Sequence, residues 1–142
     1  MEVIGLFREL VPSADASSVG IRDLIGQISD QERAPIVTYL RNAVPVFDVM
    51  GAEHDPFDKS VCISGAPSLI SDGYWIWRYD LEYYVDRYKI ELNRAFVEMV
   101  VSGHRKYIVD ATVQAKWAEI LRCYDAACRR FGSKCGWLSG SA

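Results

Sequence analysis

Apolar residues recur every three to four positions in several stretches of the chain, which is the spacing of one helix face. The pattern predicts helices over residues 1–10, 31–42, 79–88 and 94–102, and a long final helix between residues 110 and 131. Asp30 and Asn93 precede two of these helices, and their side chains are expected to cap them. Trp117 lies in the middle of the final apolar stripe, so we expect Trp117→Ala to destabilise the fold by about 3–5 kcal/mol.

The middle of the chain has the β-branched and aromatic character of strands. Val44–Gly51 and Val61–Ser64 each predict a strand, and the polar segment Ala52–Ser60 between them predicts a loop. Two further apolar runs flank Ser71-Asp72-Gly73, and Asp-Gly supplies the positive φ of a tight turn, so residues 68–77 predict a β-hairpin. Helices on both sides of this region predict one α+β domain over residues 1–132, with helices packed on a small, mainly antiparallel sheet, and a loose tail over residues 133–142.

Composition and charge narrow the classes of function. The 142 residues carry 16 Lys and Arg against 19 Asp and Glu, a formal charge of −3, which disfavours a basic nucleic-acid binder. Glu2, Arg8 and Glu9 interrupt the first apolar stretch as no signal peptide would allow, and no stretch has the 18 apolar residues of a membrane span. The four cysteines form no C-x-x-C pair. We therefore expect a cytoplasmic protein with free, packing thiols and no membrane partner.

The best candidate for catalysis or metal binding is His54, which lies between Glu53 and Asp55. A carboxylate could orient it as a base, or it could begin a metal site. The alternative is a solvated loop histidine, because neighbouring side chains rarely converge on one point and the chain has only one other histidine, His104. We expect no catalytic residue, no metal site and no cofactor.

A protein-binding face is the better-supported hypothesis. Seven aromatic residues fall between positions 74 and 88, and most have the spacing of core residues. Tyr79 and Tyr83 do not share this spacing and so lie off the apolar stripe of the predicted helix. They are interleaved with Asp80, Glu82 and Asp86, an arrangement typical of a protein interface. A second acidic cluster comprises Glu53, Asp55 and Asp58. Each acidic cluster has a plain alternative as a solvated polar surface.

One part of the chain resembles a family. The segment Ser68–Trp77, followed by Asp80-Leu81-Glu82-Tyr83-Tyr84-Val85, Tyr88, Leu92 and Phe96, is similar to the pattern TDG-x-W-x-W…DL-x-YYV-x-x-Y…LP-x-x-F of small bacterial immunity proteins. These belong to contact-dependent growth inhibition and related polymorphic-toxin systems. The likeness covers roughly residues 33–100, and departs from the pattern at Arg78 and Asn93, where proline is commoner.

The resemblance implies a binding protein rather than an enzyme. A member of this family would hold one cognate toxin domain, the C-terminal region of a large secreted effector, in a 1:1 complex in the cytoplasm. Many such toxins are nucleases with cationic clefts, which an acidic inhibitor complements. The alternatives are a protein-binding or regulatory module of unrelated role and, least favoured, a small enzyme using His54 and the nearby carboxylates.

Overall fold

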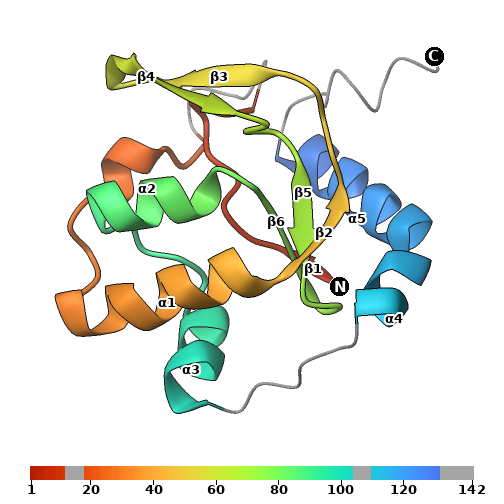
Figure 1. Ribbon diagram of the computed structural model, residues 1–142. Coiled ribbons are helices and arrows are strands. Elements are labelled where there is room, and N and C mark those ends of the chain that lie inside the picture. The colour runs from red at the N-terminus through yellow and green to blue at the C-terminus, as the bar shows by residue number, and fades with distance from the viewer. Residues whose placement is uncertain (12–17, 104–109, 132–142) are drawn as a thin grey trace.

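The computed structural model describes residues 1–11, 18–103 and 110–131, and its centre is a four-stranded sheet (Figure 1). The strand order is β1 (Glu2–Val3), β6 (Trp75–Arg78), β5 (Leu69–Ser71) and β2 (Val44–Phe47). The β1 strand runs parallel to β6, and the other pairs are antiparallel. The predicted hairpin is confirmed, since Leu69 pairs with Arg78 and Ser71 with Ile76, and Gly73 in the turn has a φ of 96°.

Helices cover both faces of this sheet, as Figure 1 shows. Along β5 and β6, Ile70, Trp75 and Trp77 belong to one apolar core, and Leu69 and Ile76 to a second on the opposite face. The first core packs against α1 (Asp30–Asn42), α2 (Leu81–Tyr88) and α3 (Arg94–Ser102), and the second against α4 (Asp110–Ala115) and α5 (Trp117–Arg130). A sheet buried on both faces explains why β6 is apolar on both sides. The α+β class predicted from the sequence is confirmed.

The polar segment predicted as a loop instead forms most of a second sheet. Strands β3 (Ala52–Asp55) and β4 (Asp58–Ser64) make an antiparallel hairpin that crosses above the α1–α3 layer (Figure 1). The prediction of a loop at 52–60 is therefore wrong. Only one face of this hairpin is covered: Val61 and Ile63 are half-buried and alternate with exposed Cys62 and Ser64. Such a strand needs few apolar residues, which is why the segment is so polar.

The predicted helix over residues 1–10 is also wrong. The backbone N–H groups of Glu2 and Ile4 donate to Tyr74 O and Ile76 O, each at 2.9 Å, and these bonds hold β1 beside β6. Gly5 then turns the chain with a φ of 77°. The apolar residues that mimic a helical stripe divide between the two cores, with Phe7 in the first and Leu6 against the second.

Helix ends agree in part with the predictions. Asn93 caps α3, accepting from Ala95 N at 2.9 Å, as expected. Ser29, not Asp30, caps α1 by accepting from Glu32 N at 3.2 Å. The short 3₁₀ helix η1 (Ile21–Leu24) precedes α1.

The predicted final helix is divided at Lys116, between α4 and α5. This break displaces Trp117 from the stripe, and Trp117 is 52% exposed while Ile120 and Tyr124 are buried. The expected burial of Trp117 is therefore wrong.

Cys62 and Cys123 are free thiols as expected, but Cys128 is disulfide-bonded, contrary to expectation. In the described part of the chain, no helix has the length and apolar character needed to span a membrane. The predicted C-terminal tail lies outside the described residues.

Candidate protein-binding groove

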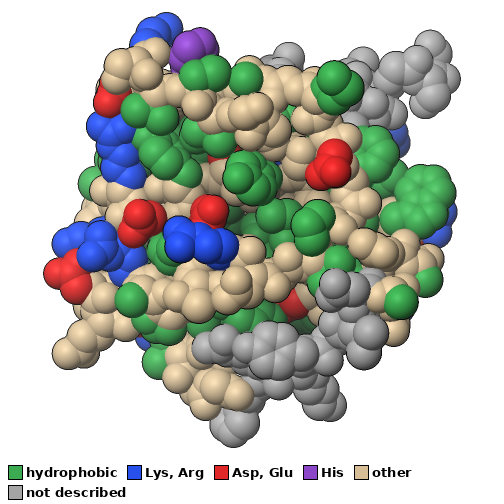
Figure 2. All heavy atoms as spheres, in the orientation of Figure 1, with side chains coloured by type: hydrophobic (Ala, Val, Ile, Leu, Met, Phe, Trp, Pro, Cys, Tyr) green, Lys and Arg blue, Asp and Glu red, His purple; other side chains and the backbone are tan. Residues whose placement is uncertain are grey.

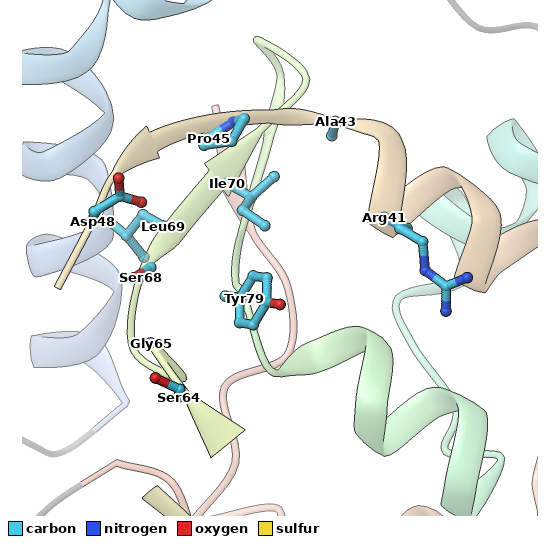
Figure 3. A pocket seen from close by; sticks show the side chains of 10 residues that line it. All are labelled: Arg41, Ala43, Pro45, Asp48, Ser64, Gly65, Ser68, Leu69, Ile70 and Tyr79. Atoms are coloured by element: carbon cyan, nitrogen blue, oxygen red, sulfur yellow. The ribbon is translucent and has the colours of Figure 1, made fainter. Parts of the chain in front are cut away.

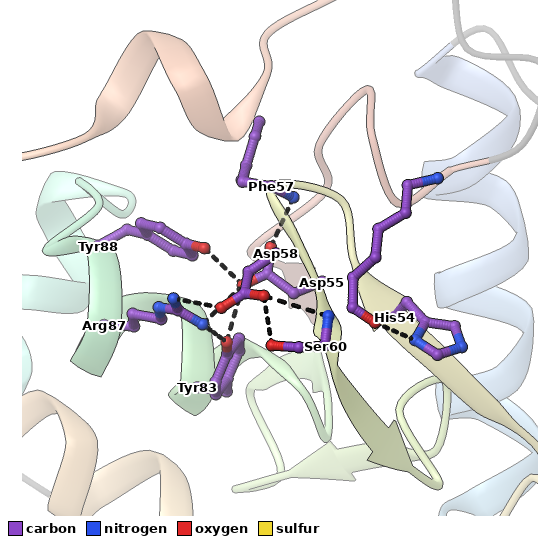
Figure 4. A network of polar contacts seen from close by, with 9 residues as sticks. His54, Asp55, Phe57, Asp58, Ser60, Tyr83, Arg87 and Tyr88 are labelled. Carbon is purple, nitrogen blue, oxygen red and sulfur yellow. Dashed lines mark hydrogen bonds and ion pairs between the residues drawn. The ribbon is translucent and has the colours of Figure 1, made fainter.

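A buried carboxylate joins the β3–β4 hairpin to α2 (Figure 4). Asp55 Oδ2 accepts hydrogen bonds from Tyr83 Oη at 2.7 Å and Tyr88 Oη at 2.5 Å, and Asp55 Oδ1 accepts from Phe57 N at 2.8 Å. Arg87 on the same helix lies 3.4 Å from Asp55 Oδ2 and 2.7 Å from Asp58 Oδ2. Asp55 has no exposed surface. These contacts fix the hairpin against the helix.

The pKa values in this network follow from its hydrogen bonds. Burial alone would raise the pKa of Asp55, but bonds from Tyr88, Phe57 N and Tyr83, together with the Arg87 charge, hold it below its usual value. Bonds from Ser60 and Arg87 lower the pKa of Asp58 to about 2. Burial and the Asp55 carboxylate raise the pKa of Tyr88. The carboxylates are therefore ionised and the tyrosines neutral at neutral pH.

A second network surrounds Arg78 at the end of β6. Its guanidinium bonds to both carboxylate oxygens of Asp80, at 3.1 and 2.9 Å, and it also donates to Leu10 O at 2.9 Å and to Glu53. Burial raises the pKa of Asp80 to about 6 although the Arg78 charge opposes the rise, so Asp80 is mainly ionised at pH 7. Arg78 thus connects the N-terminal segment, the β3–β4 hairpin and the start of α2.

The two networks bury or pair most of the residues that the sequence predicts to bind a partner. Asp55 and Asp80 are buried, and Tyr83 donates to Asp55. Each of the remaining acidic residues lies within ion-pair distance of an arginine of the same chain: Glu53 with Arg78, Asp58 with Arg87, Glu82 with Arg41 at 2.9 Å and Asp86 with Arg33 at 3.9 Å. Of the eight predicted residues, only Tyr79 combines an exposed side chain, 45% accessible, with the absence of any polar side-chain contact within the described chain.

His54 is exposed on β3 and turned away from its neighbouring carboxylates. Its Nδ1 lies 3.0 Å from Lys59 O, and Asp55 bonds to Tyr83 and Tyr88 (Figure 4). Glu53 bonds to Arg78. Successive residues of a strand point to opposite faces, so no neighbouring carboxylate orients the imidazole. Within the described residues, no cluster of three or more His, Cys, Asp or Glu side chains could hold a metal ion.

Tyr79 lies in a groove of about 280 Å³ (Figure 3). The other lining residues come from the end of α1, from β2 and the residue after it, and from the β4–β5 connection and β5: Arg41, Ala43, Pro45, Asp48, Ser64, Gly65, Ser68, Leu69 and Ile70. Figure 2 shows apolar side chains gathered across the middle of this face, between the β3–β4 hairpin and α1, with charged side chains beside them. An apolar, aromatic centre with a polar rim is the anatomy of a protein-binding surface.

Ser68 fixes two sides of the groove. Its carbonyl oxygen accepts from Tyr79 N at 2.7 Å, and its buried hydroxyl accepts from Val49 N at 2.9 Å. Gly65 N also donates to Gly51 O at 2.6 Å, so the segment after β2 is held along the β4–β5 turn. The groove is therefore formed before any partner arrives, which lowers the entropic cost of binding.

Two charged residues lie at opposite ends of the groove in Figure 3. Arg41 at one end is paired with Glu82. Asp48 at the other end is exposed and has no ion pair or hydrogen bond within the described chain. Sequence reasoning missed Asp48 and Ser68, although a lone acidic residue inside the apolar run Val44–Gly51 was a usable signal.

The chain was compared with protein-family models, curated proteins and solved structures. None of them matches it, so the comparisons assign it to no family.

Proposed function

We propose that this chain is a cytoplasmic immunity protein, which binds one cognate toxin domain and neutralises it. The observation that carries the proposal is Tyr79, a residue that is 45% exposed in a preformed groove. Tyrosine is enriched among the residues that dominate binding energy, because its ring supplies contact area and its hydroxyl a hydrogen bond. The likeness of residues 33–100 to immunity proteins supports the choice of partner.

The groove is a better contact surface than the two acidic clusters. Their carboxylates are hydrogen-bonded or paired inside the chain, and breaking the buried pairs to bind a partner would cost several kcal/mol. The groove can be occupied without breaking any of these contacts. A protein-binding module of unrelated role would use the same surface. The enzyme alternative has less support, because His54 lacks an orienting carboxylate.

We expect the neighbouring gene to encode a large secreted protein whose C-terminal end is the toxin domain, and the test is co-expression with that domain. We expect the chain to relieve toxicity and to co-purify as a 1:1 complex. Failure to form a complex, or to protect the cells, would overturn the proposal.

The contact surface is tested with two matched tyrosine variants. Tyr79→Ala should weaken the complex about tenfold or more, as loss of an interface anchor does. Tyr74→Ala is the control, since Tyr74 is 55% exposed on the β5–β6 turn, outside the groove. Asp86→Lys probes the α2 face. If Asp86→Lys disrupts the complex and Tyr79→Ala does not, the partner binds α2 rather than the groove.

A further inference from the structure

The size of the groove limits what it can hold. Its volume, about 280 Å³, lies just below the range of small-molecule sites, which run from roughly 300 to 1,000 Å³. A groove of this size suits one large side chain of a partner. Leu69 and Ile70 are buried beside it and Pro45 is exposed at its edge, so the side chain must offer apolar or planar surface.

The charge of the lining selects the kind of side chain. Arg41 is the cation of the lining, and Glu82 lies 2.9 Å from it, so this positive charge is already paired. Asp48 is exposed and lacks a counter-ion in the described chain. The groove therefore carries one uncompensated negative charge, and a cationic group complements it.

Tyr79 adds a preference for a planar cation. An arginine guanidinium stacks on aromatic rings and can also bond to a carboxylate in two places, whereas a lysine ammonium does neither as well. The protein uses the same contact elsewhere: the Arg87 guanidinium lies 5.3 Å from the Tyr88 ring centre, and the Arg22 guanidinium 5.3 Å from that of Phe57.

From the volume, the unpaired carboxylate and the exposed ring together, we infer that the groove binds an arginine side chain of the partner protein. The side chain lies against Tyr79, and its guanidinium pairs with Asp48. This inference rests on the proposed function for the identity of the partner, but the chemistry of the groove can be tested without it.

The first experiment titrates the isolated protein with N-acetyl-arginine methylamide and follows backbone amide NMR signals. We expect saturable shifts centred on Ser68 and Tyr79. The citrulline analogue, which has the same shape without the charge, should bind at least about fivefold more weakly, as should the arginine compound to Asp48→Asn. Equal binding of the two compounds, or no saturation at the solubility limit, would overturn the inference.

The second experiment measures affinity for the cognate toxin domain. Asp48→Asn should weaken the complex about tenfold, while Asp86→Asn, an exposed carboxylate outside the groove, should change it less than twofold. If the wild-type complex forms and Asp48→Asn binds equally well, the inference fails and the proposed function stands. If the arginine compound binds as expected but no toxin complex forms, the proposed function fails and the chemistry of the groove stands.

Discussion

The Asp55 network makes a quantitative prediction about what holds the β3–β4 hairpin in place. In Asp55→Asn, an amide nitrogen replaces Oδ2, the atom that accepts the hydroxyl protons of Tyr83 and Tyr88. The amide oxygen can still accept from Phe57 N, as Oδ1 does at 2.8 Å. The substitution therefore removes two hydrogen bonds to a charged acceptor and the longer Arg87 contact at 3.4 Å, and it keeps the contact with Phe57 N.

The expected loss of stability follows from these bonds. Each hydrogen bond to a charged group contributes about 1.5–3 kcal/mol, and the new neutral bonds between the amide and the hydroxyl oxygens return about 1 kcal/mol each. The net decrease in the free energy of unfolding is therefore about 1–4 kcal/mol. Because the contacts join the hairpin to α2, amide hydrogen exchange should accelerate in β3 and β4 before it does so in β5 and β6.

Urea unfolding followed by the fluorescence of the buried Trp75 and Trp77 measures the loss. His54→Ala is the matched control, because His54 is the adjacent residue on the same strand and is exposed. We expect it to change the free energy of unfolding by less than about 0.5 kcal/mol. If Asp55→Asn is as mild as this control, the network does not hold the hairpin and the reasoning is refuted.

Three further outcomes are expected. Trp117→Ala should cost less than about 1 kcal/mol, whereas Ile120→Ala, three residues along the same helix and fully buried, should cost about 2–5 kcal/mol in chemical unfolding. Asp58 has a pKa of about 2 against 3.8 unfolded, so its contribution to stability is complete above about pH 4 and is lost as the pH falls through 2. The difference in the free energy of unfolding between wild type and Asp58→Asn should therefore narrow over that range. A constant difference would contradict this. Arg78→Met leaves the buried Asp80 without its counter-ion and should lower the free energy of unfolding by about 3–5 kcal/mol, measured at pH 7.

Local signals in the sequence predicted the elements that local chemistry determines. The β5–β6 hairpin depends on the positive φ of Gly73, and the start of α3 on the Asn93 side chain, so both are visible within a few residues. The predicted helix over residues 1–10 is wrong for the opposite reason. Its helical spacing is real, but pairing of Glu2 and Ile4 with β6 decides its conformation, and no neighbouring residue reveals that pairing.

In the candidate site, too, features set by nearby residues could be predicted and features set by distant contacts could not. Tyr79 could be selected because it lies off the apolar stripe of its segment. That Glu82 pairs with Arg41 and Glu53 with Arg78 could not be foreseen, because each pair joins distant segments. Acidic residues that look available in the sequence are thereby neutralised in the fold. Asp48 remains unpaired only because of where the chain places it, and the groove itself exists only where several separate segments meet.

The position of β1 has a consequence for the order of folding. Glu2 pairs with Trp75, so β1 can dock only after the chain has been synthesised as far as β6. Closing so long a loop is entropically costly and slows folding. The other neighbour of β1 is α5, which leaves the ribosome later still. We expect the β5–β6 hairpin and α1–α3 to assemble first, while β1 is among the last segments to reach its native position.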